Sequence, residues 1–253
     1  MIDINNRAFA YGDGVFETCK VHEGDVPWWP RHRVRLQMGC ETLGIGWEDV
    51  SARLDSGRET ILAEHPDADW LKLVVARASS GRGYKRTTTD AELYWAAGTM
   101  TPWAPRISIV EFVTNPNSNA RLAGIKHLNR LPEVLASDRA DPVNGNDVLT
   151  TDVDDRVVCA SSSNFFAVID GCIVTPSIET AGVRGIMREW VCEVDDVQIR
   201  ALSRGLLTMA SECFLTNAIR GIVSVDRIES RKLPTHTPVA DRLRIRLGET
   251  EWA

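Results

Sequence analysis

The chain has 253 residues, 43% hydrophobic and 25% charged, which is the composition of an ordinary globular protein with a sizeable core. The net charge is −6, and the lysines and arginines are scattered, so the sequence indicates no nucleic-acid-binding surface. It contains no apolar stretch of membrane-spanning length and no signal-peptide pattern in MIDINNRAFA, and we therefore expect a cytoplasmic protein without membrane contact.

The six cysteines are widely spaced, with no CxxC pair and no histidines at metal-ligand spacing. We expect reduced thiols and no metal site. An acidic protein can still bind a small anionic metabolite through local arginines, so a small-molecule substrate remains possible.

The first part of the chain mixes strand and helix patterns. Residues 15–21 (VFETCKV) predict a strand followed by a turn, and residues 32–43 and 52–64 predict helices. Residues 71–78 and 106–112 predict two more strands, and the segment SSGRGYKR between them is a turn-rich loop.

Prolines and the run NPNSN interrupt regular structure between about residues 105 and 120. We place a domain junction there, which predicts an N-terminal α/β domain over residues 1–110, a linker over 111–120 and a C-terminal domain over 121–253. In the second part, a helix is expected from Leu131, then two strands joined at Asp170 and Gly171. The remaining expected elements are a helix over 185–194, strands at CFLTNA and IVSVDRI, and a helix around 243–247.

Lys126 is a candidate imine-forming nucleophile. It lies in the apolar-flanked segment LAGIKHLN, and burial can lower the pKa of a lysine enough to make it nucleophilic. The alternative is an ordinary surface lysine whose stem packs on apolar neighbours. Gly182 and Gly185 precede an apparent helix in AGVRGIMRE, where free backbone N–H groups suit a phosphate, although a plain turn before a helix would look the same.

Five segments in order resemble the fold-type IV pyridoxal-phosphate enzymes, the class IV aminotransferase family. They are RAFAYGDGVFE (7–17), HRVRL (32–36), GIKHLNR (124–130), SSSNFF (161–166) and AGVRGIMR (181–188). The resemblance spans nearly the whole chain. It implies an α+β protein of two domains, like the branched-chain aminotransferases, with a larger C-terminal domain that has a β-barrel-like core, and with pyridoxal 5'-phosphate in the cleft between the domains.

The resemblance also implies roles for single residues. Lys126 would carry the cofactor as a Schiff base and later transfer protons, and Arg35 would bind the cofactor phosphate. The remaining cofactor contacts that it implies are Cys159, Ser162, Asn164, Gly185, Ile186, Met187, Asn217 and Ala218, and its substrate-side residues are Tyr11, Arg82 and Tyr84. Branched-chain enzymes have a hydroxyl residue at the position of Ala218, so one phosphate contact is missing.

Cys159 is the largest departure from the family pattern. Family members usually carry a glutamate five residues before the asparagine that corresponds to Asn164, and its carboxylate keeps the pyridine nitrogen protonated. A thiol is mostly neutral at pH 7 and is a poor acceptor. Three accounts remain open: a weak contact with an unprotonated ring, substitution by Asp154 or Asp155 after a register shift, or reduced activity. We favour the first, because the SSSN match has no gap.

Within the family, GRGY (81–84) and KHLNR are most similar to the aminodeoxychorismate lyases, which eliminate pyruvate from 4-amino-4-deoxychorismate to give 4-aminobenzoate in folate biosynthesis. The expected function is therefore that lyase activity. The alternatives are a branched-chain or D-amino-acid aminotransferase and a catalytically weakened ligand-binding relative. The resemblance further implies a homodimer. Family chains usually have a short extra strand before the first motif, so the N-terminal sheet is expected to lack an edge strand.

Overall fold

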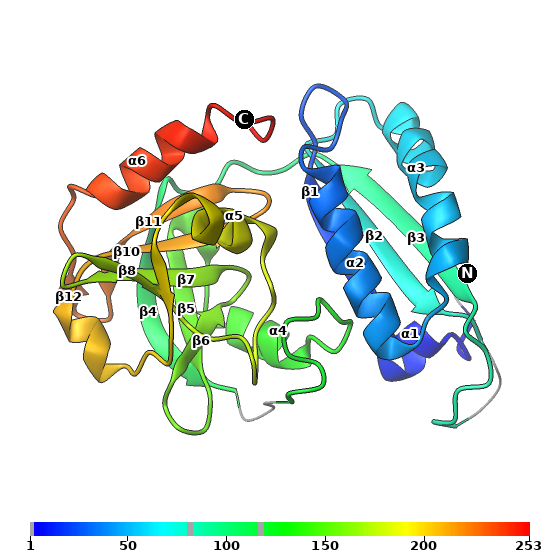
Figure 1. Ribbon diagram of the computed structural model, residues 1–253, viewed down its shortest axis with the longest axis horizontal. Coiled ribbons are helices and arrows are strands. Elements are labelled where there is room, and N and C mark those ends of the chain that lie inside the picture. The colour runs from blue at the N-terminus through cyan, green and yellow to red at the C-terminus, as the bar shows by residue number, and fades with distance from the viewer. Residues whose placement is uncertain (1–2, 80–82, 116–118) are drawn as a thin grey trace. The chain divides into compact units, whose positions relative to one another are not determined.

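The computed structural model describes residues 3–79, 83–115 and 119–253 (Figure 1). The chain forms two compact units, Met1–Met100 with Ile125–Arg130, and Thr101–Gly124 with Leu131–Ala253. This division differs from the predicted domains at 1–110 and 121–253 in two ways. Strand β4 (Arg106–Thr114) continues through residue 110, and the segment that carries Lys126 belongs to the first unit.

The first unit is a three-stranded antiparallel sheet with helices packed on it. Its strands are β1 (Gly14–Lys20), β2 (Trp70–Arg77) and β3 (Ala91–Gly98), in the order β1-β2-β3. Helix α2 (Trp29–Leu43) packs on β1 and helix α3 (Trp47–Glu64) on β3, while the short α1 (Arg7–Tyr11) precedes the sheet (Figure 1). Alternation along β1 buries Val15, Glu17 and Cys19 on one face.

The outer edge of β1 is partly covered by the segment that carries Lys126. The Phe16 backbone N–H donates to the Lys126 carbonyl at 2.9 Å, and the Leu128 N–H donates to the Gly14 carbonyl at 3.0 Å. A single antiparallel bridge joins Val15 and His127. The edge of β1 that lies opposite β2 thus fixes the backbone of the candidate lysine.

The second unit is built on a curled mixed sheet in the order β6-β5-β4-β11-β10-β7-β8-β9, with β12 paired to β11. Its strands after β4 are β5 (Asn146–Thr151), β6 (Val157–Ala160), β7 (Asn164–Ile169), β8 (Cys172–Thr175), β9 (Val197–Ile199), β10 (Ala210–Asn217), β11 (Gly221–Ile228) and β12 (Arg231–Lys232). Its helices are α4 (Leu131–Ser137), α5 (Ile186–Val194) and α6 (Pro238–Leu247), with 3-10 turns at Pro142–Asn144 and Gly205–Met209.

The core of the second unit lies on the inner face of this sheet. Phe165 on β7, Leu215 on β10 and Ile107 on β4 are buried there together. Strand β7 is buried along its whole length, and its apolar run FFAVI is typical of a buried strand. This strand begins at Asn164, one of the predicted cofactor residues.

Most of the predicted elements are confirmed, with shifted starts. Helix α2 begins at Trp29 rather than 32, because Pro30 is well suited to a first helical turn, and it ends at Gly44 with φ 66° as expected. The sequence patterns do not predict β3, β5 or the separate strand β6. In β5, the sequence NDVLTT is polar, yet five of its six residues are buried, so its local pattern is not that of a core strand.

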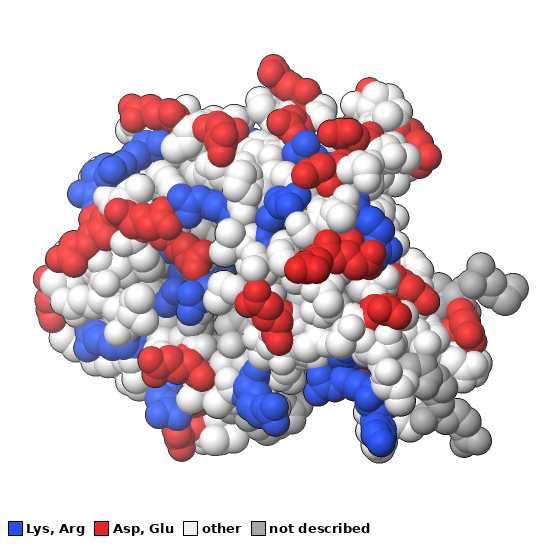
Figure 2. Space-filling model, turned by 45° about the vertical axis from the view of Figure 1, so that its right-hand side comes forward, with Lys and Arg blue, Asp and Glu red and all other residues white. Residues whose placement is uncertain are grey.

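Within the described ranges, no helix has the length and apolar character needed to cross a membrane. Acidic and basic side chains are intermingled on the face drawn in Figure 2, and the coloured residues there form no continuous basic surface. This agrees with the scattered lysines and arginines of the sequence.

Candidate active site

Lys126 lies beside an aromatic ring in the first unit. Its Nζ is 4.2 Å from the centre of the Phe16 ring, and the residue is only partly exposed. Burial of the ammonium group and the nearby charge of Arg35 lower the pKa of Lys126 to about 7, against the opposing effect of Glu17. A substantial fraction of the side chain is therefore a neutral amine at pH 7, as a nucleophilic or basic lysine requires.

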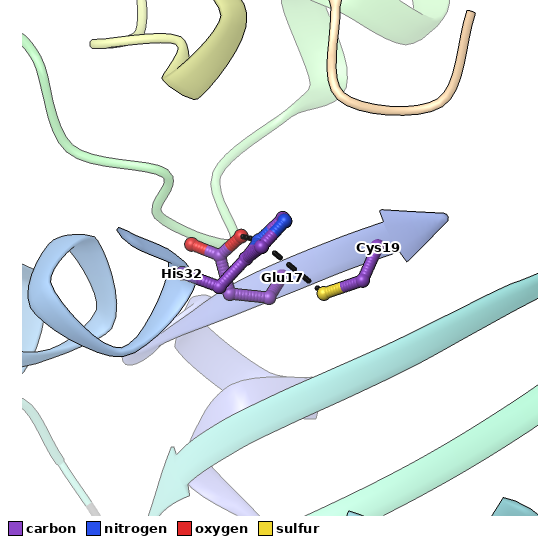
Figure 3. Close-up of side chains that lie close together, drawn as sticks. All are labelled: Glu17, Cys19 and His32. Carbon is purple, nitrogen blue, oxygen red and sulfur yellow. Dashed lines mark hydrogen bonds and ion pairs between the residues drawn. The ribbon is translucent and has the colours of Figure 1, made fainter. Parts of the chain in front are cut away.

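A buried carboxylate, that of Glu17, organises the residues near Lys126. It accepts hydrogen bonds from Arg35 Nε at 2.8 Å and Arg35 Nη2 at 2.5 Å, and it lies 2.7 Å from His32 Nδ1. Figure 3 shows Glu17 on its strand facing His32 on the neighbouring helix. Burial acts to raise the pKa of Glu17, but the charge and hydrogen bonds of Arg35 and the hydrogen bond of His32 lower it to about 2. Glu17 is therefore a fixed negative charge.

Cys19 completes a group that at first resembles a metal site. The ligand atoms of Glu17, Cys19 and His32 lie within 4.8 Å of one another, and the Cys19 Sγ is 3.2 Å from His32 Nδ1 (Figure 3). Burial and the charge of Glu17 raise the pKa of Cys19 well above its ordinary value, whereas a metal needs the thiolate. Both Glu17 oxygens already have partners, and Arg35 adds a positive charge. Glu17, Cys19 and His32 are therefore better described as parts of a hydrogen-bonded network than as ligands of a cation.

The structure thus gives Arg35 a partner that the sequence does not predict. Arg35 is buried on α2, and the Nε–Nη2 edge of its guanidinium is held by Glu17. Its predicted contact with the cofactor phosphate stays a prediction. Sequence reasoning gives no role to Glu17 or His32, but signals for both exist: a carboxylate on the apolar face of β1, and a histidine one helical turn from Arg35.

The substrate-side residues Tyr11 and Tyr84 lie together in the first unit, whereas Arg82 lies outside the described residues. The two rings meet edge to face with their centres 5.4 Å apart. The Tyr11 hydroxyl accepts a hydrogen bond from the Gly83 N–H at 3.2 Å, and Tyr84 is 86% exposed. An exposed aromatic ring on an anchored backbone suits contact with a flat ligand.

Buried arginines anchor this loop. Arg7 donates to the carbonyls of Gly83 at 2.9 Å and Tyr84 at 3.2 Å. Its Nε also donates to Asp13 Oδ2 at 2.9 Å, and the same oxygen accepts from the buried Arg77 at 3.0 Å. One oxygen of Asp13 therefore binds two buried cations, and the carboxylate links the start of the chain to the loop.

In the second unit, α5 begins in a way that suits an anion. Gly185 precedes the helix, and no side chain caps the first turn, which contains the buried Ile186 and Met187. Uncapped N–H groups and the helix dipole favour a phosphate. Asn164 lies against this turn, since it donates to the Val183 carbonyl at 2.9 Å and its Oδ1 would be 1.9 Å from a Cβ on Gly185. The backbone can adopt this close approach only because residue 185 is glycine.

Asn217 forms a second polar loop in the same unit. Its Nδ2 donates to Ser163 Oγ at 3.0 Å, and its Oδ1 accepts from the Arg220 N–H at 2.7 Å. The Ala218 carbonyl accepts from the Trp252 ring N–H at 3.0 Å. The predicted Ser162 is exposed, and the side chain that contacts Asn217 is that of its neighbour, Ser163. Because residues 161–163 are all serine, the sequence alone does not show which of the three contacts Asn217.

Cys159 stays in register on β6 opposite Thr150 on β5. Its Sγ lies 3.3 Å from the Thr150 hydroxyl oxygen. Neither alternative acid lies on the strand, because Asp154 is ion-paired with Arg156 in the preceding turn and Asp155 has φ 57° there. The assignment of Cys159 to the position where family members carry glutamate stays a prediction.

A small α/β unit and a larger unit with a curled mixed sheet make up the fold of the fold-type IV enzymes. The family model described as amino-transferase class IV matches residues 14–228, and the chain belongs to that family.

Known relatives include lyases and aminotransferases. The aminodeoxychorismate lyase of Vibrio harveyi is 27% identical over 94% of this chain and 91% of its own length. The structure of 4-amino-4-deoxychorismate lyase from Pseudomonas aeruginosa is 30% identical, has a TM-score of 0.87 and aligns with 98% of this chain and 94% of its own. A hypothetical aminotransferase from Mycobacterium tuberculosis in a PLP-bound form has a TM-score of 0.75 at 20% identity, with coverage of 96% and 90%. The last likeness concerns the fold alone.

Proposed function

We propose that the protein is a pyridoxal-phosphate-dependent aminodeoxychorismate lyase that uses Lys126 as its amine. The observation that carries the proposal is the Lys126 side chain, whose pKa is lowered to about 7 beside the Arg35–Glu17 pair. The similarity to two lyases over almost the whole chain supports the choice of activity.

Residues of this chain fit the aldehyde and the phosphate of this cofactor. In the first unit, a partly neutral amine suits an aldehyde. In the second unit, the uncapped start of α5 and the space left by Gly185 suit a phosphate. When bound, pyridoxal phosphate would supply an electron-withdrawing ring that stabilises negative charge on the substrate carbon that bears the amine.

Lys126 supplies the proton transfers of the reaction. Its neutral amine removes the proton from the ring carbon that bears the substrate amine. The electron pair left behind breaks the neighbouring carbon–oxygen bond, and the substrate ring becomes aromatic as 4-aminobenzoate. The enolate of pyruvate leaves and becomes pyruvate when it takes up a proton. Burial and the nearby charge of Arg35 bring the lysine close to half-ionised at pH 7, so that it can both accept and return a proton.

An aminotransferase is the second candidate, since the family includes such enzymes. The presence of Cys159 favours lyase activity over aminotransferase activity. A thiol opposite Thr150 does not stabilise a protonated pyridine nitrogen as a carboxylate does. Transamination relies on a strong electron sink to hold its carbanion, whereas elimination gains the aromaticity of its product. The missing carboxylate should therefore harm transamination more.

Visible absorption and product analysis test the proposal. The purified protein with added pyridoxal phosphate should show an imine band, and borohydride should fix the label on Lys126. Lys126→Ala should lose the band, while Lys72→Ala, a change at an exposed lysine of the same unit, should keep it. Pyruvate should be released from 4-amino-4-deoxychorismate faster than D- or branched-chain amino acids are transaminated. The reverse order would support the aminotransferase, and a protein that stays colourless would support a ligand-binding relative.

We propose in addition a homodimer located in the cytoplasm. Both follow from the family resemblance and the sequence. Sedimentation equilibrium of the purified chain tests the first, since a mass close to 28.1 kDa would exclude the dimer.

A further inference from the structure

We infer that Glu17 is a positioning residue for Lys126 and Arg35, whose carboxylate fixes the guanidinium and sets the electric field in which the lysine amine works. The inference rests on the proposed role of Lys126 as the reactive amine. It gives a function to a buried acid that the mechanism above does not require to touch the substrate.

The contacts of Glu17 leave it little freedom. Its two oxygens bind the Nε–Nη2 edge of Arg35 side-on, which is the geometry that fixes a guanidinium plane most firmly. His32 Nδ1 approaches the oxygen Oε2 at 2.7 Å, and the whole group is buried, with Glu17 1% exposed and Arg35 8%. Rotation of Arg35 would therefore leave a buried carboxylate without its main partner.

Glu17 is also joined to Lys126 through the backbone. It follows Phe16 on β1, whose N–H donates to the Lys126 carbonyl and whose ring lies 4.2 Å from Lys126 Nζ. A change in the position of β1 would therefore move the lysine as well. Strand β1 carries the Glu17 carboxylate, helix α2 carries the Arg35 guanidinium, and the segment paired with β1 carries the Lys126 amine.

The charged groups of this network carry opposite signs, and its other members are neutral. At pH 7, Glu17 is negative and Arg35 positive, while Cys19 is neutral because burial and Glu17 raise its pKa. His32 is also neutral, since burial lowers its pKa further than the hydrogen bond to Glu17 raises it. The positive charges of Arg35 and Arg130 favour the neutral amine of Lys126, and the negative charge of Glu17 favours its ammonium form. Loss of Glu17 alone should therefore suppress protonation of the lysine.

His32 and Cys19 support the orientation of Glu17. A neutral His32 with its proton on Nδ1 donates to Glu17, and this tautomer leaves the Cys19 Sγ as a weaker second neighbour at 3.2 Å (Figure 3). The carboxylate oxygen Oε2 therefore has contacts with both Arg35 and His32.

The test measures the ionisation of Lys126 directly in the full chain prepared without cofactor. Acetic anhydride modifies only neutral amines, so the rate of Lys126 acetylation against pH, read by mass spectrometry of its peptide, gives the midpoint of its titration. In Glu17→Gln the midpoint should fall by about one pH unit, because an opposite charge nearby shifts a pKa by roughly one to three units. In Arg35→Gln it should rise by a similar amount.

The variant Glu17→Asp separates the effect of the carboxylate charge from that of its position. It retains the carboxylate, so its midpoint should stay near that of the wild type even if the protein is less stable. Glu64→Gln, on the exposed surface of α3, is the matched charge control and should leave the midpoint unchanged. A Glu17→Gln midpoint equal to the wild type, or a Glu17→Asp shift as large as that of Glu17→Gln, would overturn the inference.

Loss of one partner from a buried pair can prevent folding, which circular dichroism would show. In that case Arg35→Gln decides, and a midpoint that is unchanged or lower overturns the inference. None of these outcomes depends on pyridoxal phosphate. A protein without an imine band but with the expected midpoints would contradict the proposed function while retaining the electrostatic role of Glu17.

Discussion

Gly185 and Asn164 approach so closely that a Cβ on the glycine would lie 1.9 Å from the Asn164 Oδ1. Asn164 is held in place by its hydrogen bond to the Val183 carbonyl, so it cannot yield without losing that bond. The close approach brings the first turn of α5 against the start of β7. The conformation of this proposed phosphate site thus depends on the absence of a single methyl group.

Gly185→Ala should therefore weaken cofactor binding. The methyl group would displace Asn164 or the helix start, at a cost of about 1–3 kcal/mol, equivalent to roughly a fivefold to 150-fold rise in the Kd for pyridoxal phosphate. Spectrophotometric titration measures this. Gly205→Ala is the control, because the nearest atom to its added Cβ is 3.9 Å away. Equal Kd values for Gly185→Ala and the wild type would remove α5 from the proposed site.

The rate of cofactor capture should depend on pH through Lys126. Only the neutral amine attacks an aldehyde, and the pKa of Lys126 is lowered to about 7 by burial and by Arg35. The association rate of pyridoxal phosphate with the cofactor-free protein should be high above pH 7 and fall about tenfold for each pH unit below it. Stopped-flow absorbance follows this rate. A midpoint near 10 would mean that the lysine is solvated and unperturbed.

Cys159→Glu should change the balance of activities. A carboxylate at this position would restore an acceptor for the pyridine nitrogen, so transamination of D- or branched-chain amino acids should increase more than pyruvate release does. Cys159→Gln is nearly the same size without the charge and should not have this effect. Parallel product assays on the three proteins make the comparison. If the glutamate and glutamine variants behave alike, Cys159 does not face the ring nitrogen.

Asp13→Asn should destabilise the first unit strongly. The Asp13 carboxylate is shared by the buried Arg7 and Arg77, and its neutralisation would leave two cations uncompensated, at a cost of about 3–5 kcal/mol. Chemical denaturation followed by fluorescence measures the loss. Asp49→Asn breaks an exposed pair with Arg53 and should cost less than about 1 kcal/mol. Similar losses in the two variants would show that Asp13 has no special role.

Local sequence patterns predict the elements that depend on their own residues. Helix α2 has turn-forming Gly44 at its end, β7 has a continuous apolar run, and α5 follows a glycine, so each is recognised within a short window. The motif order predicts the family and singles out Lys126. Predicting these features requires only the conformational preferences of neighbouring residues and the spacing of apolar residues.

Other features depend on partners that are distant in sequence. Strand β3 is defined by its pairing with β2 and by α3, and the polar β5 is a strand because β4 and β6 lie on either side of it. Their local sequences are compatible with loops. Tertiary hydrogen bonding and burial determined their conformation.

The sequence by itself determined that this chain carries a fold-type IV motif set with Lys126 as its candidate amine. Only the tertiary structure decided the surroundings of that amine. It placed β1, α2 and the Lys126 segment together, so that Glu17 meets Arg35 and His32 across separations of 18 and 15 residues. The reason is physical: the ionisation of a buried lysine depends on the distance and solvation of charges, and folding alone sets both.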